Sequence, residues 1–493
     1  MTKLANEMTI AEAARTLRAR ELTVRELWDA CAEAAEARNS DLNAFLEIFD
    51  ADDATIAAAQ ERIDANDSSL LCGIPLAIKD NILIEGKIAS AASKMLENYR
   101  ATYDATVIKK LKEAGALFFG RTNMDEFAMG SSTEHSAFGP TKNPHDTARV
   151  PGGSSGGSAT AVAAHMAIAA LGSDTGGSIR QPAAFTGLVG LKPTYGAVSR
   201  SGLIPLGSSL DQIGPVAKTV EDARILYDAI RGEDALDSTT IPDGLYSTNP
   251  PTGGSTHLRV GVPRHLLREG VEADVLTAFD ATLESLVQAG HTLVDVELPT
   301  SSHALAAYYV VMPAEVSTNL ARLDGMRYGF AKRGETLLDD YLLSRTEGFG
   351  EETRRRILLG TFVLSSGYID AYYRKADAAR MVLRREFEKA FEACDVIASP
   401  TTPSPAFTFG EKSNPLAMYL EDIFTVTANL TGMPAISVPM GTVEREGPST
   451  SFDSAQDKSL GIKKQLPVGI HFTAPHQEED TLFTIGRSVE DSR

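Results

Sequence analysis

The stretch PGGSSGGSATAVAAHMAIAALGSDTGGSIRQP, residues 151–182, contains two glycine- and serine-rich turns joined by a helix-forming segment and a strand-forming segment. The Ala-rich part GGSATAVAAHM predicts about three helical turns, which span roughly 15–18 Å. The part AIAALGSD predicts a returning strand of about five or six residues, which spans roughly 17–20 Å. Because the two lengths nearly cancel, Ser154 and Ser178 are expected to lie close together at one end of a sheet, where open α/β sheets place their sites.

The first turn, GGSSGGS at 152–158, could instead hold a phosphate, since glycine-rich loops that open a helix are common anion sites. A P-loop needs G-x-x-x-x-G-K-[ST], and this turn has no lysine. The dinucleotide pattern G-x-G-x-x-G is also missing from it. The residues therefore disfavour a phosphate site.

A serine hydroxyl is a poor nucleophile until a base takes its proton, so the turns raise the question of a base. None of the nine histidines lies in a glycine turn or at an obvious strand end. Lys79 does lie at a strand end, because it closes the apolar run in LLCGIPLAIKDNIL, residues 70–83. Partial desolvation there would lower the pKa of its amine from about 10.4 towards the range in which the neutral amine accepts a proton. These residues predict a relay from Ser178 through Ser154 to Lys79.

A plainer alternative remains open at this point. Lys79 could pair with Asp80 or another acid at the sheet edge, and the two serines could be helix caps and turn residues. The stretch DTGGSIR, residues 174–180, favours catalysis, because it supplies consecutive backbone N–H groups before Ser178 at a predicted helix N-terminus. An oxyanion hole requires such donors, and each typically contributes about 10²–10³ in rate.

Outward from this stretch, the chain alternates between helix and strand patterns. Residues 8–65 predict two or three helices with start signals at Thr9 and Thr23. The strand that ends at Lys79 and Asp80 is followed by a predicted helix, glycine turn and strand, and this alternation favours a largely parallel sheet with helices outside it. Further strands are expected in LRVGVP (258–263), HTLVDVELP (291–299), DVIASPTTP (395–403) and the neighbouring pair AISVPMG (435–441) and LPVGIHFTA (466–474), with helices at 273–290 and through most of 305–392.

Two polar stretches interrupt this pattern. Residues 232–257 are rich in turn formers and predict a surface excursion or linker. Residues 443–465 separate the last two strands and are expected to form an exposed, mobile insertion.

Composition limits the class of protein. The 493 residues carry a formal charge of -19 and are 43% hydrophobic, which is enough for a large core. The negative surface should repel nucleic-acid phosphates and anionic membranes, so a nucleic-acid partner would be handled locally or by another subunit. Three scattered cysteines, Cys31, Cys72 and Cys394, give no metal or disulfide pattern and are expected to be buried. No signal peptide or membrane span is predicted, so we expect a cytoplasmic protein or one in an organelle matrix.

Three segments together resemble the amidase signature family: GIPLAIKDN (73–81), PGGSSGGSA (151–159) and GSDTGGSIRQPAAFTGLVGLKPTYG (172–196). The resemblance implies one domain over 1–493, with a large mixed central β-sheet covered by helices on both faces. Its parts would be N-terminal helices at 1–70, the signature core at 71–220 and the remaining sheet and helices at 258–493. By the same resemblance Lys79 is the base, Ser154 the bridging serine and Ser178 the acyl-forming nucleophile. The oxyanion hole would consist of the amides of Thr175, Gly176, Gly177 and Ser178, and no metal is expected.

Segments outside the signature resemble the A-subunit family of the glutamyl-tRNA(Gln)/aspartyl-tRNA(Asn) amidotransferases. They are 123–139, 308–329, 344–376 and 415–439. This resemblance implies a glutaminase whose pocket binds the glutamine α-carboxylate through Arg356 and the α-ammonium through Asp422, with Tyr309 lining it. Arg355 is an alternative to Arg356 as the carboxylate-binding arginine, because shifting the alignment by one residue would exchange the two.

The resemblance also implies partners and a division of chemistry. A B subunit would use ATP and magnesium to activate the misacylated tRNA, a small C subunit would clamp the pair, and this chain would need no cofactor. The tRNA would bind only indirectly, through the B subunit. Two alternatives are a stand-alone amidase for a small or hydrophobic amide and a catalytically silent scaffold.

Overall fold

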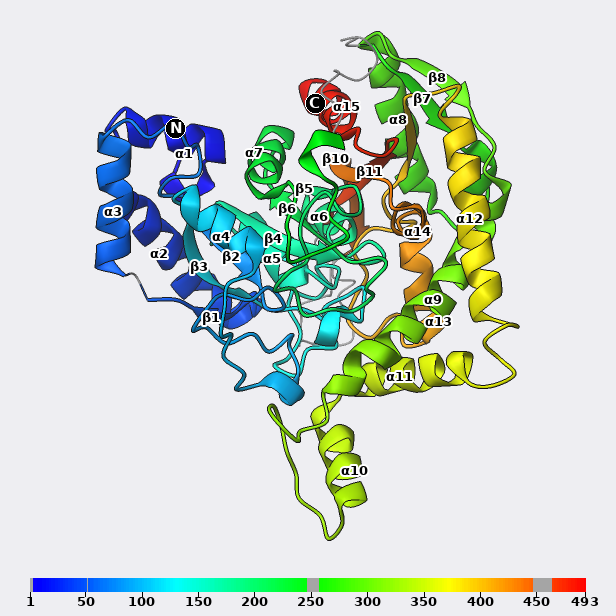
Figure 1. Cartoon of the computed structure of the whole chain (residues 1–493). Coiled ribbons are helices and arrows are strands. Elements are labelled where there is room, and N and C mark those ends of the chain that lie inside the picture. The colour runs from blue at the N-terminus through cyan, green and yellow to red at the C-terminus, as the bar shows by residue number, and fades with distance from the viewer. Residues whose placement is uncertain (1–2, 51, 246–256, 447–462) are drawn as a thin grey trace, which may run out of the picture.

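The computed structural model describes residues 3–50, 52–245, 257–446 and 463–493. Strands from the segments 1–70, 71–220 and 258–493 join one eleven-stranded sheet in the order β1-β3-β2-β4-β6-β5-β10-β11-β9-β7-β8 (Figure 1). The strands are β1 (Phe45–Ile48), β2 (Pro75–Lys79), β3 (Leu117–Thr122), β4 (Ala169–Asp174), β5 (Val189–Lys192), β6 (Gln212–Ala217), β7 (Arg259–Val262), β8 (Thr292–Asp295), β9 (Val396–Pro400), β10 (Ala435–Glu446) and β11 (Lys463–Thr473).

The sheet is mixed in direction. β3, β2 and β4 are parallel neighbours on one side, and β9, β7 and β8 are parallel neighbours on the other. The pairings from β4 through β6, β5, β10 and β11 to β9 are antiparallel, as is the edge pairing of β1 with β3. The mixed sheet implied by the family resemblance is confirmed, whereas the largely parallel sheet predicted from local alternation is wrong. Local alternation fails because strand direction is fixed by pairing between segments far apart in sequence.

Helices cover both faces of this sheet. Gly469 of β11 lies beside Ser437 of β10 and Ala184 of α6, while Val438 of β10 lies beside Gly486 of α15. Because successive strand residues point to opposite faces, α6 and α15 are on opposite sides. The helices are α1 (Ile10–Arg18), α2 (Val24–Leu42), α3 (Asp53–Asp64), α4 (Thr106–Glu113), α5 (Gly156–Ala163), α6 (Arg180–Thr186), α7 (Val220–Ile230), α8 (Ala273–Gln288), α9 (Ala304–Asn319), α10 (Leu337–Gly348), α11 (Glu351–Leu364), α12 (Tyr373–Ala390), α13 (Pro415–Tyr419), α14 (Val426–Thr431) and α15 (Glu479–Asp491).

The N-terminal region follows its local signals closely. Thr9 and Thr23 cap α1 and α2, and each forms a reciprocal capping box with Glu12 or Glu26 three residues later. The predicted helices are confirmed, but the sequence reasoning missed β1, whose four residues are too few to show a strand period.

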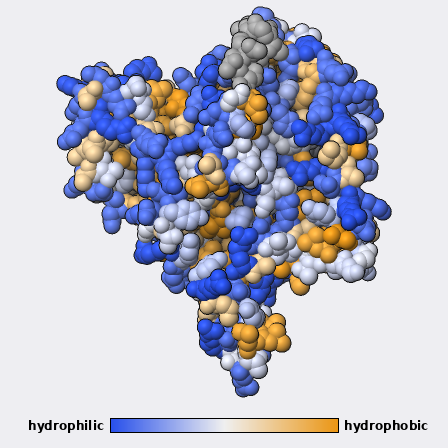
Figure 2. Space-filling model, in the orientation of Figure 1, coloured by the Kyte–Doolittle hydropathy of each residue, from blue (hydrophilic) through white to orange (hydrophobic). Residues whose placement is uncertain are grey.

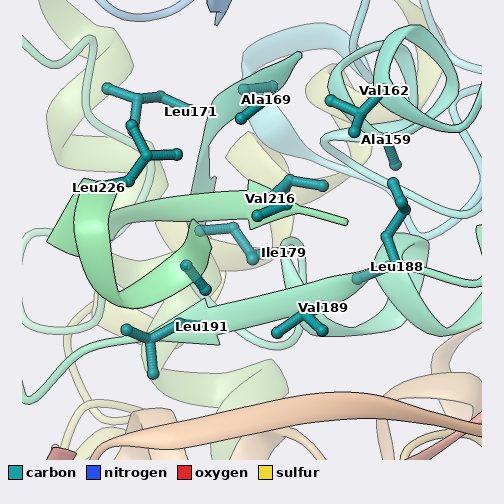
Figure 3. Packing of buried hydrophobic residues seen from close by; sticks show 14 of the residues in the cluster. Ala159, Val162, Ala169, Leu171, Ile179, Leu188, Val189, Leu191, Val216 and Leu226 are labelled. Carbon is teal, nitrogen blue, oxygen red and sulfur yellow. The ribbon is translucent and has the colours of Figure 1, made fainter. Parts of the chain in front are cut away.

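The quoted stretch is part of the hydrophobic core. Figure 3 shows Ala159 and Val162 of α5 and Ala169 of β4 in the same cluster as side chains of β5 and β6. All three are fully buried. The helix α5 and strand β4 follow each other as predicted, but α5 has eight residues, about two turns rather than the predicted three. Both elements are buried next to the two serine turns. The three cysteines are buried, as expected.

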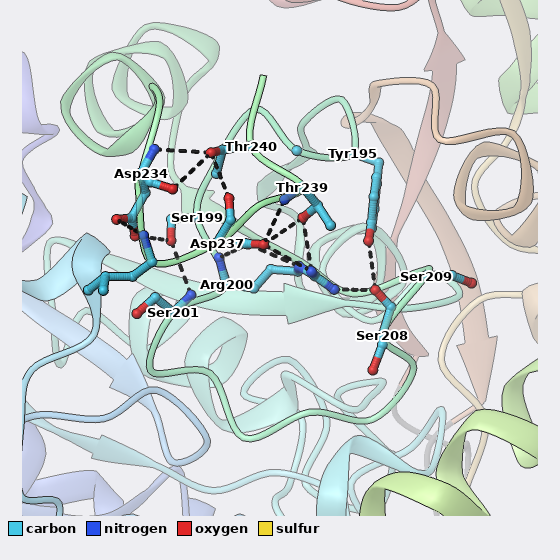
Figure 4. A network of polar contacts seen from close by, with 12 residues as sticks. Tyr195, Ser199, Arg200, Ser201, Ser208, Ser209, Asp234, Asp237, Thr239 and Thr240 are labelled. Carbon is cyan, nitrogen blue, oxygen red and sulfur yellow. Dashed lines mark hydrogen bonds and ion pairs between the residues drawn. The ribbon is translucent and has the colours of Figure 1, made fainter. Parts of the chain in front are cut away.

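The first half of the polar stretch 232–257 is hydrogen-bonded to the rest of the protein. Arg200 forms an ion pair with Asp237, whose carboxylate also accepts the Arg200 amide at 2.8 Å (Figure 4). Asp234 accepts hydrogen bonds from Ser199 and Thr106. Residues 232–245 are thus held against the body, and 246–256 lie outside the described residues.

The second polar stretch is shorter than predicted, because β10 continues to Glu446 and β11 begins at Lys463. The two strands pair antiparallel to their ends, as expected for neighbouring strands. Residues 447–462, where the mobile part was predicted, lie outside the described residues.

The helix α10 protrudes from the body (Figure 1), and Figure 2 shows apolar residues gathered over it. Leu337, Leu338 and Leu342 are the exposed leucines of this helix. Among the described residues, no helix is both long and apolar enough to cross a membrane.

Candidate active site

The Lys79 amine lies at the end of β2, fully buried among serine oxygens. Its Nζ is 2.8 Å from both Ser154 Oγ and Ser155 Oγ, 3.0 Å from Ser173 Oγ and 3.2 Å from the Ser173 carbonyl oxygen. An ammonium can donate only three protons, whereas Nζ has four oxygen neighbours. When the amine is neutral, one of the three hydroxyl neighbours can therefore donate its proton to Nζ. This geometry suits an amine that exchanges a proton with Ser154.

Burial lowers the pKa of Lys79 to about 7, although the carboxylates of Asp125, Asp174 and Asp211 act against this shift. The alternative in which Lys79 merely pairs with Asp80 is wrong. Asp80 is instead engaged by Arg121 at 2.9 Å and by the Ser90 hydroxyl.

Ser154 and Ser178 come from the two predicted turns, and the turns are in contact. The Ser155 amide donates to the Ser178 carbonyl oxygen at 3.1 Å. Ser154 is fully buried, whereas Ser178 is 8% exposed, so Ser178 is the hydroxyl that a substrate can reach. No hydrogen bond joins the two hydroxyls among the described residues, so the predicted relay between them stays a prediction.

Sequence reasoning missed Ser155, Ser173 and Asn81. Ser155 and Ser173 contact the Lys79 amine directly, and the Asn81 amide donates to Ser173 Oγ at 2.9 Å. The double serine in the first turn was a signal for Ser155. Ser173 shows no sequence signal, because only strand pairing brings it beside β2.

The nucleophile turn is held by Asp174, the last residue of β4. Its carboxylate accepts the amides of Gly177 at 2.9 Å and Ile179 at 3.1 Å, on either side of Ser178. Arg180 binds both carboxylate oxygens, at 2.9 and 3.0 Å, and this charge pairing holds the pKa of Asp174 well below its usual range. Ser178 is therefore presented by a turn whose two flanking amides are fixed.

The four amides predicted for the oxyanion hole are not equivalent. The Gly177 amide already donates to Asp174. Among the described residues, the amides of Thr175, Gly176 and Ser178 have no hydrogen-bond partner. Glycine is required at 177, because its φ of +145° is one that L side chains rarely adopt. The three unpaired amides are the donors available to a developing oxyanion.

Asp422 lies close to the nucleophile turn. Thr425 donates to the Gly176 carbonyl oxygen at 2.6 Å and to the Asp422 carbonyl oxygen at 3.1 Å. The Asp422 carboxyl group accepts from the Ser131 hydroxyl at 2.8 Å and the Tyr309 hydroxyl at 3.4 Å. Burial raises its pKa to about 7. A cationic ligand group here would restore the charged carboxylate.

The structure distinguishes the two candidate arginines. Arg356 is buried, with its guanidinium 5.3 Å from the Tyr309 ring and 5.2 Å from the Tyr419 ring. Its Nε donates to Glu352 at 2.7 Å. The Arg355 side chain is 42% exposed and pairs with Glu351 and Glu352. Arg356 is therefore the arginine that lies beside Tyr309, and its binding of the glutamine carboxylate stays a prediction.

Tyr419 is a further residue that the sequence reasoning missed. Its ring stacks on Tyr309 with centroids 3.8 Å apart, and its hydroxyl donates to Glu352 at 3.0 Å. Arg356 and Tyr419 line a cavity of about 550 Å³ that also includes Arg355, Gly130 and Glu126. Lys79, Ser178, Tyr309 and Asp422 are not among its lining residues, so the cavity lies on the arginine side of the site. The described residues contain no cluster of His, Cys, Asp or Glu that could hold a metal ion.

Comparisons with known proteins agree with this arrangement. The family model described as Amidase matches residues 26–483. The glutamyl-tRNA(Gln) amidotransferase A subunit of Desulfatibacillum aliphaticivorans is 46% identical over 493 residues, covering 98% of this chain and 97% of that protein. The protein of the same name from a Nitratiruptor species is 51% identical over 420 residues, covering 85% of this chain and 90% of that protein.

Solved structures show the same similarity. The crystal structure of the glutamyl-tRNA(Gln) amidotransferase A subunit from Thermotoga maritima has a TM-score of 0.78 and 40% identity, covering 100% of this chain and 96% of that one. A peptide amidase from Stenotrophomonas maltophilia has a TM-score of 0.77 and 28% identity, covering 98% of this chain and 96% of that one. The fold is therefore shared by an amidotransferase subunit and a peptide amidase.

Proposed function

The chain belongs to the amidase family, and we propose that it is the glutaminase subunit of a tRNA-dependent amidotransferase. It hydrolyses glutamine to supply ammonia for converting Glu-tRNA(Gln) to Gln-tRNA(Gln), Asp-tRNA(Asn) to Asn-tRNA(Asn), or both. The observation that carries the proposal is the buried Lys79 amine 2.8 Å from Ser154 Oγ, in a chain that is about half identical to named subunits of this kind.

The chemistry begins with Ser178. Its Oγ attacks the side-chain amide carbon of glutamine, while its proton passes to Ser154 and the Ser154 proton passes to the Lys79 amine. The amides of Thr175, Gly176 and Ser178 stabilise the oxyanion that forms. The C–N bond then breaks, the leaving nitrogen takes a proton back along the same route, and ammonia departs.

The second half returns the enzyme to its starting state. Water attacks the glutamyl ester, its proton follows the same route to Lys79, and the C–O bond to Ser178 breaks. Ser178 recovers a proton and glutamate leaves. Lys79 thus serves as the base in both half-reactions. This requires an amine whose pKa lies near the working pH. Burial lowers the pKa of Lys79 into that range.

Free glutamine also carries two charges that the pocket must match. We assign the α-carboxylate to Arg356 and the α-ammonium to Asp422, with Tyr309 between them. The Tyr309 hydroxyl is 3.4 Å from Asp422, and its ring lies beside the Arg356 guanidinium. These opposite charges favour an amino-acid amide over a simple amide.

We further propose that ammonia passes to a B subunit, which uses ATP and magnesium to activate the misacylated tRNA, and that a small C subunit clamps the pair. The printed names of the relatives, which describe subunits, support a multi-subunit assembly. The charge of -19 supports tRNA binding through the partner rather than this chain. We place the complex in the cytoplasm or an organelle matrix.

The test is ammonia release from glutamine by the full chain, alone and with candidate B and C partners. Wild type, Ser178→Ala and Asp422→Ala are compared. We expect partner-dependent activity that Ser178→Ala abolishes and Asp422→Ala weakens through KM. Efficient cleavage of simple amides without partners, with no effect of Asp422→Ala, would identify a stand-alone amidase instead. No turnover of any amide would identify a silent scaffold.

A further inference from the structure

Glu126 is a buried carboxylate that the proposed mechanism does not use. It opens the 3-10 helix η3 (Glu126–Ala128), in the loop that follows β3, and it is 3% exposed. Among the described residues its carboxylate is paired with two hydroxyls and a backbone amide and with no basic side chain. Burial raises the pKa of Glu126, although these donors act against the shift. Because an unpaired buried carboxylate is costly, the three donors indicate a defined role for this side chain.

The Glu126 carboxylate joins the loop to the start of α11. Its Oε2 accepts the Gly350 amide at 2.8 Å and the Thr353 hydroxyl at 2.5 Å. Gly350 is the N-cap of α11 and has no side chain with which to cap the helix. Glu126, 224 positions earlier in the chain, supplies the acceptor instead, and its charge faces the positive end of the helix dipole. A Cβ at Gly350 would lie 2.6 Å from Glu126 Oε2, so loop and helix are in close contact.

The helix end that Glu126 holds is the one that carries Arg356. Thr353 and Arg356 are three positions apart on α11, about one turn, and both are buried. Movement of the first turn of α11 therefore moves the Arg356 guanidinium relative to the Tyr309 ring, 5.3 Å away.

The loop that contains Glu126 also contacts the other charged group of the pocket and the catalytic turn. Ser131 donates to the Asp422 carboxyl group at 2.8 Å. The Asp125 carboxylate accepts the Thr133 amide at 2.9 Å, and the Asp125 amide donates to the Ser154 carbonyl oxygen at 3.3 Å. One loop thus contacts the Ser154 turn, Asp422 and the helix that carries the arginine.

We propose that Glu126 is a positioning residue that fixes α11 against this loop and so holds Arg356 at the distance from Ser178 that the substrate requires. The identity of that substrate, glutamine, rests on the proposed function. The positioning depends on hydrogen bonds rather than on charge. In Glu126→Gln the side-chain oxygen can still accept from α11, and Ser93, which donates to Glu126 Oε1 at 2.5 Å, can donate instead to the Gly348 carbonyl oxygen, 3.3 Å away.

Glutamine kinetics of the assembly, with Glu126→Ala and Glu126→Gln, test the proposal. Glu126→Ala should raise KM about tenfold and leave kcat within about twofold, because binding is lost equally in the ground state and the transition state. Hydrolysis of propionamide, an amide without the α-carboxylate, should stay at the wild-type rate. Glu126→Gln should keep KM within about twofold of wild type. An equal loss in both variants, or a loss in kcat alone, overturns positioning by hydrogen bonds.

Glu351→Gln is the matched control, because Glu351 is an acid in the same first turn whose side chain is 81% exposed and pairs with Arg355. It should leave KM unchanged. A double-mutant cycle then identifies the residue through which Glu126 acts. Adding Glu126→Ala to Arg356→Gln should change KM by less than about twofold, because the guanidinium to be positioned is already missing. Fully additive effects on KM overturn the link to Arg356.

Hydrogen exchange of the full chain tests the contact without any turnover. The amides of 350–357 should exchange about tenfold faster in Glu126→Ala than in wild type, and at the wild-type rate in Glu351→Gln. Thr353→Val removes one donor with little change in volume and should show a smaller increase, which decides the matter if Glu126→Ala does not fold. Wild type that fails to hydrolyse glutamine would overturn the proposed function and leave this readout intact. Unchanged exchange in both Glu126→Ala and Thr353→Val overturns the role of Glu126 in holding α11.

Discussion

The Lys79 amine determines how the rate should depend on pH. Its pKa is lowered to about 7 by burial, so the amine is neutral above pH 7 and protonated below it. Only the neutral form accepts the Ser154 proton, and kcat at saturating glutamine should therefore fall about tenfold between pH 8 and pH 6. The measurement is the pH profile of kcat for the active assembly.

The titration of Asp422 must be distinguished from that of Lys79, because the pKa of Asp422 is also near 7. It must be ionised to bind the glutamine ammonium, so its protonation should raise KM as pH falls without changing kcat. In Asp422→Asn the KM profile should become flat while the kcat profile keeps its acid limb. A kcat that is constant from pH 6 to pH 8 would remove Lys79 as the base.

Arg356 and Arg355 form a matched pair for testing the carboxylate site. Arg356→Gln should raise KM for glutamine roughly tenfold or more, the expected effect of losing a charge-assisted hydrogen bond of about 1.5–3 kcal/mol. Arg355→Gln should change KM little, because the Arg355 side chain is 42% exposed and faces Glu351. Initial rates over a range of glutamine concentrations measure both.

Propionamide, which lacks the carboxylate, is the control for this pair. Its slow hydrolysis should be equal in wild type and Arg356→Gln if the variant remains folded around Ser178. A larger effect of Arg355→Gln than of Arg356→Gln on glutamine KM would reverse the assignment.

At the scale of elements, the α9–α11 contact positions the glutamine pocket, since α9 carries Tyr309 and α11 carries Arg356. A Cβ at Gly360 of α11 would lie 1.8 Å from the Pro313 carbonyl oxygen of α9. Helix propensity alone would make Gly360→Ala stabilising. The clash should instead lower the free energy of unfolding by about 1–3 kcal/mol and raise KM by shifting α11.

Denaturant unfolding and KM together test this prediction. Gly244→Ala is the matched control, since a Cβ there meets no atom within 4 Å. It should leave both quantities unchanged. A Gly360→Ala protein with wild-type stability and KM would show that the two helices can separate without cost.

Elements set by local signals could be predicted from the sequence, and those set by distant pairing could not. The caps at Thr9 and Thr23 are local, and so is the strand ending at Lys79. The contact of Ser173 with Lys79 depends on β4 lying beside β2. The residues alone placed Ser154 near Ser178 by segment length, whereas the pocket residues Tyr309, Arg356 and Asp422 came only from the family resemblance.

Over the whole molecule, charge decides which macromolecule the chain can bind unaided. The formal charge is -19, and Figure 2 shows a mostly hydrophilic face with several apolar patches, one of them on α10. The central sheet joins strands from 45–48 to 463–473 into one unit. Phosphate contacts supply most nonspecific nucleic-acid affinity, and a net negative chain has few lysines and arginines to spare for them.

The isolated chain should therefore show no measurable tRNA binding by fluorescence anisotropy at physiological salt, and the assembly with its proposed partners should bind. Lowering the salt from about 200 mM to 50 mM should strengthen binding of the assembly by orders of magnitude, because bound counterions are released, but should not reveal binding by the isolated chain. A catalytically inactive Ser178→Ala assembly should bind tRNA as wild type does, since Ser178 acts on glutamine and not on tRNA in this scheme. If the isolated chain binds tRNA with a steep salt dependence, a basic surface must exist locally despite the net charge, and the assignment of tRNA recognition to a partner fails.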